Sequence, residues 1–366
     1  MPDDLPLAEP PTPMTGRLLT LPTGPFFHLQ RAEKSTYRIG EFRAWAGYKN
    51  LGTDVATHDL AHFQHVLSFA ATEQAGRTGV HAHLAHAHIV IPTSGQGTFS
   101  YDGVITVAVL GMVIVQHGGT VHDQFNYSYA AASDEENRRT PLAVEGPAAG
   151  TPLRSFGFLE LFVPRAFANV EIVPPGAVTP TDQATAWDHP YHAPGHFALQ
   201  REEAPDAAYR PVAGHDDLEA RDAGTWDASD RLVATWILRP VATGSTSAAL
   251  TPMTLGIVGE SGGIEIFYMV SGSGRFRPAG GAEVWLHAGD TSTHSQGELE
   301  GPFEVSPDFR LLRFFIAARA QLLRERTPAE IARIEALGPA IIRGREIRPP
   351  NDTRPVNALR DAAAQP

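Results

Sequence analysis

Four of the chain's 16 histidines fall within eight consecutive residues, His81-Ala82-His83-Leu84-Ala85-His86-Ala87-His88. An apolar, β-branched segment follows at residues 89–91, and a glycine-containing turn follows at residues 94–97. Alternate residues of a strand point to the same face, so His81 and His83 can share a face with Cα atoms about 6.6 Å apart. Two imidazoles at this spacing can converge on one metal ion through bonds of about 2.1 Å. A further histidine, His122, follows several short apolar runs later.

Short apolar runs separated by turns continue on both sides of this stretch. Between residues 78 and 126 they alternate with turns rich in glycine and aspartate, and residues 155–163 have the same character. Residues 62–69 fit a strand, although a short helix also fits. A second block of this kind runs from Arg231 to Ile316. Each block has a Gly-x-Gly turn and a later turn that begins with histidine, at His117 and His287. This pattern predicts an all-β chain with a duplicated barrel.

The length of 366 residues indicates two domains rather than one core. We predict a first barrel over residues 17–170, a connector over 171–230, a second barrel over 231–320 and a tail over 321–366. The tail has one short predicted helix, which Thr327 can cap, Pro328 can begin and Pro339 ends.

Composition excludes several classes of function. The net charge of −12 argues against a nucleic-acid or anionic-membrane surface, because either needs a basic field. The chain has no cysteine, which excludes disulfides, thiolate catalysis and cysteine-ligated metal sites. The first 15 residues lack the pattern of a signal peptide, and no apolar stretch is long enough to span a membrane. We therefore expect a cytoplasmic protein that binds a small molecule and forms, at most, a homo-oligomer.

The spacing of the histidines resembles the two motifs of the cupins. The first motif has the form His-x-His, three or four residues, Glu, six residues, Gly, and here it reads His81-x-His83, four residues, His88, six residues, Gly95. The second ends in a histidine, three residues and Asn, and here it runs from Gly111 through His117-x-Gly119 to His122 and Asn126. The resemblance implies two double-stranded β-helix, or jelly-roll, barrels, which is the arrangement of a bicupin.

The resemblance also implies one divalent metal ion, held by His81, His83, His88 and His122. His88 stands where the family has glutamate, and His117 stands where it has proline. Four imidazoles bring no charge to offset the ion, so the site should favour an anionic substrate or a deprotonated water. His86 competes with His88 for the third position, because a turn in residues 84–87 must reset the face for either. Imidazole suits iron, copper, nickel and zinc alike, so the ligands do not select the metal.

The second block resembles a cupin barrel that has lost its metal. Glu265 matches the end of the first motif, while Ser292 stands where the second motif has histidine, and His294 is displaced by two residues.

Four other residues of the first block are candidates to line the pocket beside His86; they are Phe99, Tyr101, Gln124 and Asn126.

A bicupin with metal in its first barrel alone is similar to the gentisate-type ring-cleaving dioxygenases. This resemblance implies an iron(II) enzyme that cleaves a small hydroxylated aromatic or enol-like acid with O₂; manganese, nickel, copper and zinc stay open as the metal. Two other classes also stay open. One is a cupin lyase or isomerase that uses the metal as a Lewis acid, and the other is a bicupin that binds a small molecule without catalysis.

Overall fold

The computed structural model describes residues 24–39, 46–58, 60–68, 83, 85–94, 96–101, 104–117, 120, 122–128, 156–163, 170–173, 197–200, 208–212, 215–241, 262–323 and 340–343. These residues are mainly strands, and the α-helices among them, α1 (Thr53–Ala56) and α3 (Thr225–Ala228), are one turn each. Short 3₁₀ helices lie at Ala32–Lys34 and Ala318–Leu323. The predicted helix between Thr327 and Pro339 lies outside the described residues.

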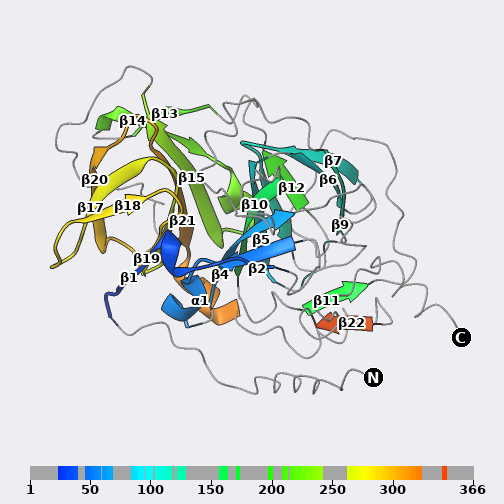
Figure 1. Cartoon of the computed structure of the whole chain (residues 1–366). Coiled ribbons are helices and arrows are strands. Elements are labelled where there is room, and N and C mark those ends of the chain that lie inside the picture. The colour runs from blue at the N-terminus through cyan, green and yellow to red at the C-terminus, as the bar shows by residue number, and fades with distance from the viewer. Residues whose placement is uncertain are drawn as a thin grey trace, which may run out of the picture.

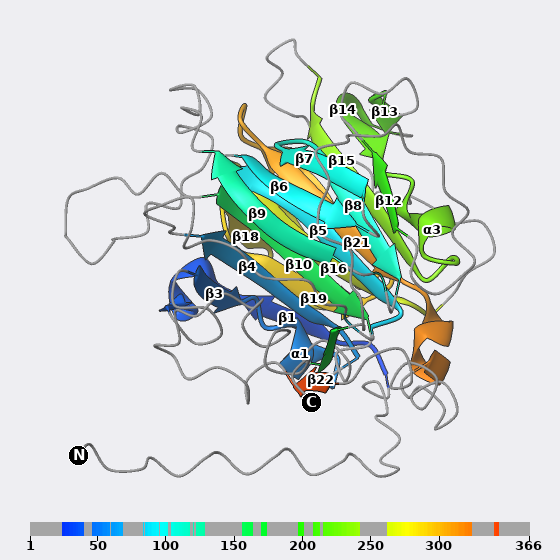
Figure 2. The same cartoon turned by 90° about the vertical axis from the view of Figure 1, so that its right-hand side faces the viewer.

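Two sheets form the first barrel. The larger has the order β12-β8-β5-β10-β4-β3-β2, made of β12 (Phe197–Gln200), β8 (Val113–His117), β5 (Ala87–Ser94), β10 (Phe156–Val163), β4 (His62–Ser68), β3 (Ala46–Asn50) and β2 (Arg38–Ile39). The smaller has the order β7-β6-β9, made of β7 (Val104–Val109), β6 (Gln96–Tyr101) and β9 (His122–Ser128). Figure 2 looks onto this barrel.

The second barrel repeats this topology. Its larger sheet has the order β1-β19-β16-β21-β15-β14-β13, made of β1 (Phe27–Gln30), β19 (Thr291–Ser295), β16 (Ile264–Ser271), β21 (Arg310–Ile316), β15 (Val233–Pro240), β14 (His215–Asp222) and β13 (Arg210–Val212). Its smaller sheet, β18-β17-β20, consists of β18 (Val284–His287), β17 (Ser273–Pro278) and β20 (Leu299–Val305). Strands β5 to β10 therefore correspond in order to β16 to β21, which confirms the predicted all-β fold of two cupin-type jelly-roll barrels (Figure 1).

Each half of the chain contributes a strand to the sheet of the other half. β1 pairs with β19 of the second barrel, and β12 pairs with β8 of the first. The predicted connector over 171–230 therefore contains secondary-structure elements that belong to the barrels, namely β12, β13, β14 and α3. The strands at 197–200 and 210–212 are too short to show a period, and the eight-residue β14 is too polar to show an apolar alternation. A separate ribbon joins β11 (Val170–Val173) to β22 (Ala340–Arg343).

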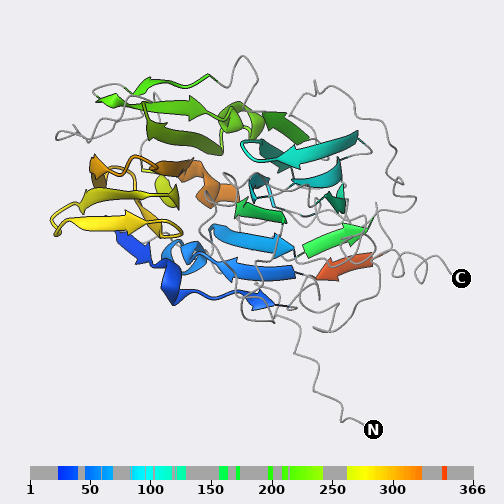
Figure 3. The ribbon, with the colours of Figure 1, turned by 45° about the horizontal axis from the view of Figure 1, so that its top comes forward.

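Three apolar clusters explain how the sheets stack. The large sheets pack on each other through one cluster, in which Phe63 of the first barrel contacts Tyr268 and Phe314 of the second at ring-centroid distances of 5.7 and 5.1 Å. A second cluster, including Phe99 and Tyr101, fills the first barrel between its two sheets, and a third fills the second barrel. Figure 3 shows the two barrels side by side. Residues of β4 and β5 thus alternate between the seam, where the barrels meet, and the interior of the first barrel.

The register corrects the expected alignment of the two halves. His117 ends β8, whereas His287 ends β18, which is the counterpart of β7. The turn at Gly289 therefore matches the turn at Gly111, and both glycines have positive φ, 84° and 88°. Across the small sheets, His122 pairs with the last residue of β6, and Leu299 pairs with the last residue of β17. The counterpart of His122 is therefore Leu299, not Ser292.

Candidate metal centre

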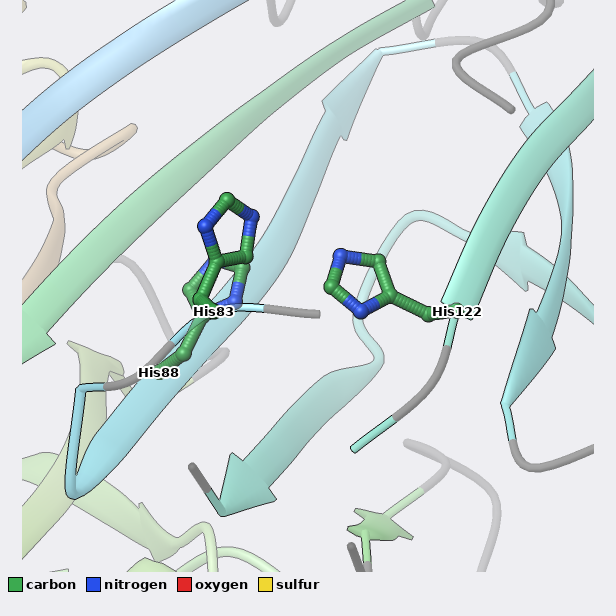
Figure 4. Close-up of side chains that lie close together, drawn as sticks. All are labelled: His83, His88 and His122. Carbon is green, nitrogen blue, oxygen red and sulfur yellow. The ribbon is translucent and has the colours of Figure 1, made fainter. Parts of the chain in front are cut away.

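Three imidazoles meet inside the first barrel. One potential ligand atom from each of His83, His88 and His122 lies within 4.8 Å of the others. The ring centroid of His83 is 5.1 Å from that of His88 and 5.1 Å from that of His122, and the remaining pair is 6.1 Å apart. Figure 4 shows the three rings facing one another, with His122 approaching from the opposite side to His83 and His88.

Strand geometry brings these side chains together. His88 is the second residue of β5, and the next residue on its face, Val90, packs inside the barrel, while Ile89 faces the seam. His122 begins β9 on the small sheet and pairs with Tyr101, so it approaches from across the barrel. His88 and His122 are buried and His83 is half-buried, so an ion here would lie largely out of water.

The backbone assigns the proton of His122. Its Nδ1 lies 3.0 Å from the carbonyl oxygen of Thr120. A carbonyl oxygen only accepts, so Nδ1 of His122 carries the hydrogen and donates it. Nε2 then keeps its lone pair and is the ligand atom that this residue can offer.

Aromatic rings wall the site. Phe162 stacks on His88 with ring centroids 4.1 Å apart and makes an edge contact with His83 at 5.2 Å. Tyr101 is fully buried, 6.1 Å from His122 and stacked on Phe99. Burial, and secondarily the charge of Glu160, raise the pKa of the Tyr101 hydroxyl well above its ordinary value. Tyr101 is therefore a neutral hydroxyl at the inner side of the site.

One acidic residue lies beside the histidines and was not expected from the sequence. Glu160 of β10 places Oε1 3.3 Å from Nε2 of His88. Its other oxygen, Oε2, accepts a hydrogen bond of 2.7 Å from the side-chain amide of Gln64. The sequence did contain a signal for Glu160, because it is the only acid in the apolar run Phe158-Leu159-Glu160-Leu161-Phe162. A charged residue at the centre of a buried strand needs a polar or charged partner.

The remaining candidates fall into three groups. His81 lies outside the described residues, as does the side chain of Asn126. Gln124 is buried on β9, one alternation beyond His122, and Phe99 pairs with it across the small sheet. His86 is half-buried and is not part of the group formed by the other three histidines.

The residues fit a divalent transition metal. Ligand nitrogens bound at about 2.1 Å stand roughly 3.0–4.2 Å apart around one ion, so the three rings need only small movements to close on it. Neutral imidazole is a common ligand for iron, nickel, copper and zinc. His83, His88 and His122 therefore form a candidate metal centre, and its ring nitrogens alone do not select the metal.

The second barrel carries an ion pair at the matching place. Glu265 is the second residue of β16, as His88 is of β5. Arg313 pairs with the fourth residue of β16, as Glu160 pairs with the fourth residue of β5. Arg313 donates from Nε to Oε1 of Glu265 at 2.9 Å and also contacts this oxygen through Nη2. A fixed guanidinium therefore stands beside the carboxylate of the second barrel.

His294 completes this buried cluster. It pairs with Glu265 across the sheet, and its Nδ1 lies 3.8 Å from the Glu265 carboxylate. Burial works to raise the pKa of Glu265, but the charge of Arg313, with smaller effects of His294 and of hydrogen bonds from Arg313 and Gly297, leaves this pKa below its ordinary value. Burial lowers the pKa of His294, against the opposing charge of Glu265.

Comparisons with known proteins assign no family to the chain. No model of a known family matches the chain, and no curated protein matches its sequence. Oxalate decarboxylase from Bacillus subtilis matches with a TM-score of 0.47 and 11% identity, over 84% of this chain and 82% of that one. A 7S globulin from Momordica charantia matches with a TM-score of 0.47 and 14% identity, over 80% and 84%.

A third solved structure is the bacterial pirin YhhW from Escherichia coli, in complex with nickel(II). It matches with a TM-score of 0.41 and 10% identity, over 80% of this chain and 99% of that one. Similarity at this level assigns no activity, so the chemistry has to come from the site itself. Within the described part of the chain, no helix is both long and apolar enough to cross a membrane; the cytoplasmic location and the homo-oligomer stay predictions.

Proposed function

We propose that the chain is a bicupin enzyme whose first barrel binds one iron(II) ion through His83, His88 and His122. The proposed reaction is the O₂-dependent cleavage of a small hydroxylated aromatic or enol-like acid, with both oxygen atoms entering the product. The observation that carries the proposal is the convergence of three imidazoles in a buried, aromatic-walled pocket. His81 stays an expected fourth ligand.

The charge of the ligand set supports an acidic substrate. Three neutral imidazoles leave the ion's two positive charges uncompensated, which favours a bound anion in a buried site. Iron(II) would supply redox chemistry with O₂ and open positions for a substrate that chelates through adjacent oxygens. The carboxylate of Glu160 offsets part of the charge and leaves a net positive centre.

The wall residues would orient the substrate. Phe162 and Tyr101 place aromatic rings beside the histidines, which gives the pocket apolar walls for a planar substrate. Tyr101 offers a neutral hydroxyl as a hydrogen-bond donor, and Gln124 a buried amide. Together they exclude water and hold the plane of a small acid at the ligand side of the imidazoles.

Oxygen uptake tests the proposal. Protein loaded anaerobically with iron(II) is mixed with a panel of hydroxylated aromatic and enol-like acids, and one O₂ consumed for each substrate lost is expected. His122→Ala should abolish uptake, and His58→Ala, at an exposed histidine of the same barrel, should leave it unchanged. Turnover without oxygen would identify the lyase or isomerase instead. Binding without turnover under any condition would leave the non-catalytic bicupin.

A further inference from the structure

A chain of polar side chains extends from His88 away from the proposed metal position. Glu160 lies 3.3 Å from His88 Nε2, and Gln64 donates to the other carboxylate oxygen at 2.7 Å. Behind it, His62 Nε2 lies 3.1 Å from Oε1 of Gln64, and His62 Nδ1 lies 3.8 Å from the carboxylate of Asp54. His88, Gln64 and Asp54 are buried, and the side chains of His62 and Glu160 are 11% and 14% exposed.

The hydrogen bonds of this chain have one consistent direction. The Gln64 amide nitrogen can only donate, so Oε2 of Glu160 accepts from it. The Gln64 carbonyl oxygen can only accept, so His62 donates from Nε2. Gln64 is thereby fixed at both ends, and it holds the Glu160 carboxylate with its second oxygen turned toward His88.

We propose that Glu160 is the positioning residue of the metal centre. In this proposal Oε1, which lies 3.3 Å from Nε2 of His88, accepts the Nε2 hydrogen once that ring binds the ion through Nδ1. This inference rests on the proposed metal site and adds which atom of His88 binds and what holds it. One ring nitrogen cannot both donate to a carboxylate and bind a cation, which makes the assignment exclusive.

A contact between Glu160 and His88 would improve metal binding in two ways. A carboxylate that accepts the far N–H of a metal-bound imidazole fixes the ring's tautomer and raises the basicity of the ligand nitrogen. It also places one negative charge close to the ion without using a coordination position. His88 brings no negative charge to the ion. Glu160 on the neighbouring strand supplies a negative charge without binding the ion directly.

The geometry favours this role over direct binding by Glu160. The group of mutually close ligand atoms contains the three histidines, and no carboxylate of the described residues joins it. Glu160 is instead close to His88, which pairs with Phe162, two residues further along β10. In the second barrel, Glu265 and Arg313 make a charged contact between β16 and β21, which correspond to β5 and β10. Both barrels therefore have a side-chain contact at these two positions.

Zinc binding to the whole chain tests the inference without any catalytic readout. Titration calorimetry with Zn²⁺ compares the wild type with Glu160→Gln and Glu304→Gln. Glutamine has one acceptor oxygen, so Glu160→Gln cannot serve both Gln64 and His88, and we expect Zn²⁺ to bind about 10- to 100-fold more weakly. Glu304, whose side chain is 49% exposed at a rim ion pair of the second barrel, is the matched control and should not change the affinity.

A second measurement reads the ligand atom directly. The ¹⁵N spectrum of histidine-labelled, Zn²⁺-loaded protein should show His88, assigned by its loss in His88→Gln, bound through Nδ1 and protonated at Nε2. If Glu160→Gln does not fold, Gln64→Leu keeps the carboxylate but frees it from the amide, and a smaller loss of affinity is expected.

The outcomes separate the two proposals. Absence of a stoichiometric Zn²⁺ site in the wild type overturns the metal centre itself. A site that depends on His83 and His122 but is unaffected by Glu160→Gln, or that binds His88 through Nε2, leaves the centre intact and overturns the positioning role. Loss of one carboxylate ligand in the Zn²⁺ X-ray absorption spectrum of Glu160→Gln would make Glu160 a ligand, and would equally overturn it.

Discussion

The two barrels place different chemistry at the same two positions. In the first, β5 and β10 bring together His88 and Glu160 at 3.3 Å, next to two further imidazoles. In the second, β16 and β21 bring together Glu265 and Arg313, and Leu299 stands where the first barrel has His122. The first barrel has three imidazoles that could hold a metal cation, whereas the second barrel has the cationic side chain of Arg313 beside its carboxylate.

The comparison shows how a barrel of this topology can hold a buried carboxylate without a metal ion. A glutamate buried in a barrel needs a compensating positive charge. Arg313 provides it permanently, with the rings of Trp236 and Phe267 5.5 and 5.7 Å from its guanidinium. The second barrel can therefore serve for packing alone, while the first should gain stability when an ion binds.

The largest expected effect comes from removing the built-in cation. Arg313→Met should leave the 2% exposed Glu265 without its main partner and destabilise the protein by about 3–5 kcal/mol. Urea unfolding at pH 7 measures the loss. The double variant Glu265→Leu/Arg313→Met should recover most of it, because two apolar residues need no charge compensation. If the single variant is as stable as the wild type, the guanidinium does not compensate the carboxylate.

Metal binding should stabilise the first barrel by a somewhat smaller amount. Zn²⁺ at about 100 times its dissociation constant should add about 2.7 kcal/mol to the free energy of unfolding. Thermal unfolding with and without the ion reads the gain. His83→Ala should remove it, and His287→Ala in the second barrel should keep it. An equal gain in both variants would place the ion elsewhere.

The sequence predicted the two barrels because the motif spacings follow from the fold itself. Glycines with positive φ follow the corresponding strands β7 and β18 at Gly111 and Gly289, so glycine turns recur in both halves. The exchange of β1 and β12 between the barrels has no recognisable sequence pattern. Each strand has four residues, and its own sequence does not indicate with which distant strand it pairs.

The site was predictable where its residues belong to the two histidine motifs. His83, His88 and His122 lie close together as their spacing suggested, while Glu160 lies 72 residues after His88 along the chain (160 − 88) and reaches it only through the β5–β10 pairing. The alignment of the second barrel failed for a related reason. The turn at residues 287–289 resembles the turn at residues 117–119 in sequence. Only the pairing of Leu299 with Pro278 shows that it corresponds to the turn at Gly111.

The seam between the barrels should respond to acid through His65. Its Nδ1 lies 2.5 Å from the Tyr37 hydroxyl and its Nε2 2.8 Å from Thr93 Oγ1. Complete burial, and then the charge of Lys49, lower the pKa of His65 to about 3. The unfolded chain binds this proton near pH 6.5, so the stability that neutral His65 contributes is present above pH 6.5 and is lost as the pH falls toward 3.

Unfolding curves at several pH values test this assignment. The loss due to His65 is at most about 1.4 kcal/mol for each pH unit below 6.5. His65→Gln should flatten the slope between pH 6.5 and 5 by one proton, whereas His58→Gln, at an exposed histidine, should not. The lowered pKa of His294 adds a second contribution in the wild type that both variants retain, so an unchanged slope in His65→Gln would assign the acid response to the second barrel.

The smallest effect should come from another arginine of the second barrel, and it isolates what burial does to an ion pair. Arg239 donates to Glu219 at 2.6 Å and stacks on Tyr209, but its side chain is 39% exposed. Arg239→Met should therefore cost no more than about 1 kcal/mol, because water already solvates both charges when they separate. High salt should weaken the Arg239 pair and leave the Arg313 pair nearly unchanged, since screening acts on charges that solvent reaches. If Arg239→Met proves as costly as Arg313→Met in the same urea experiment, burial does not explain the cost of losing the Arg313 pair.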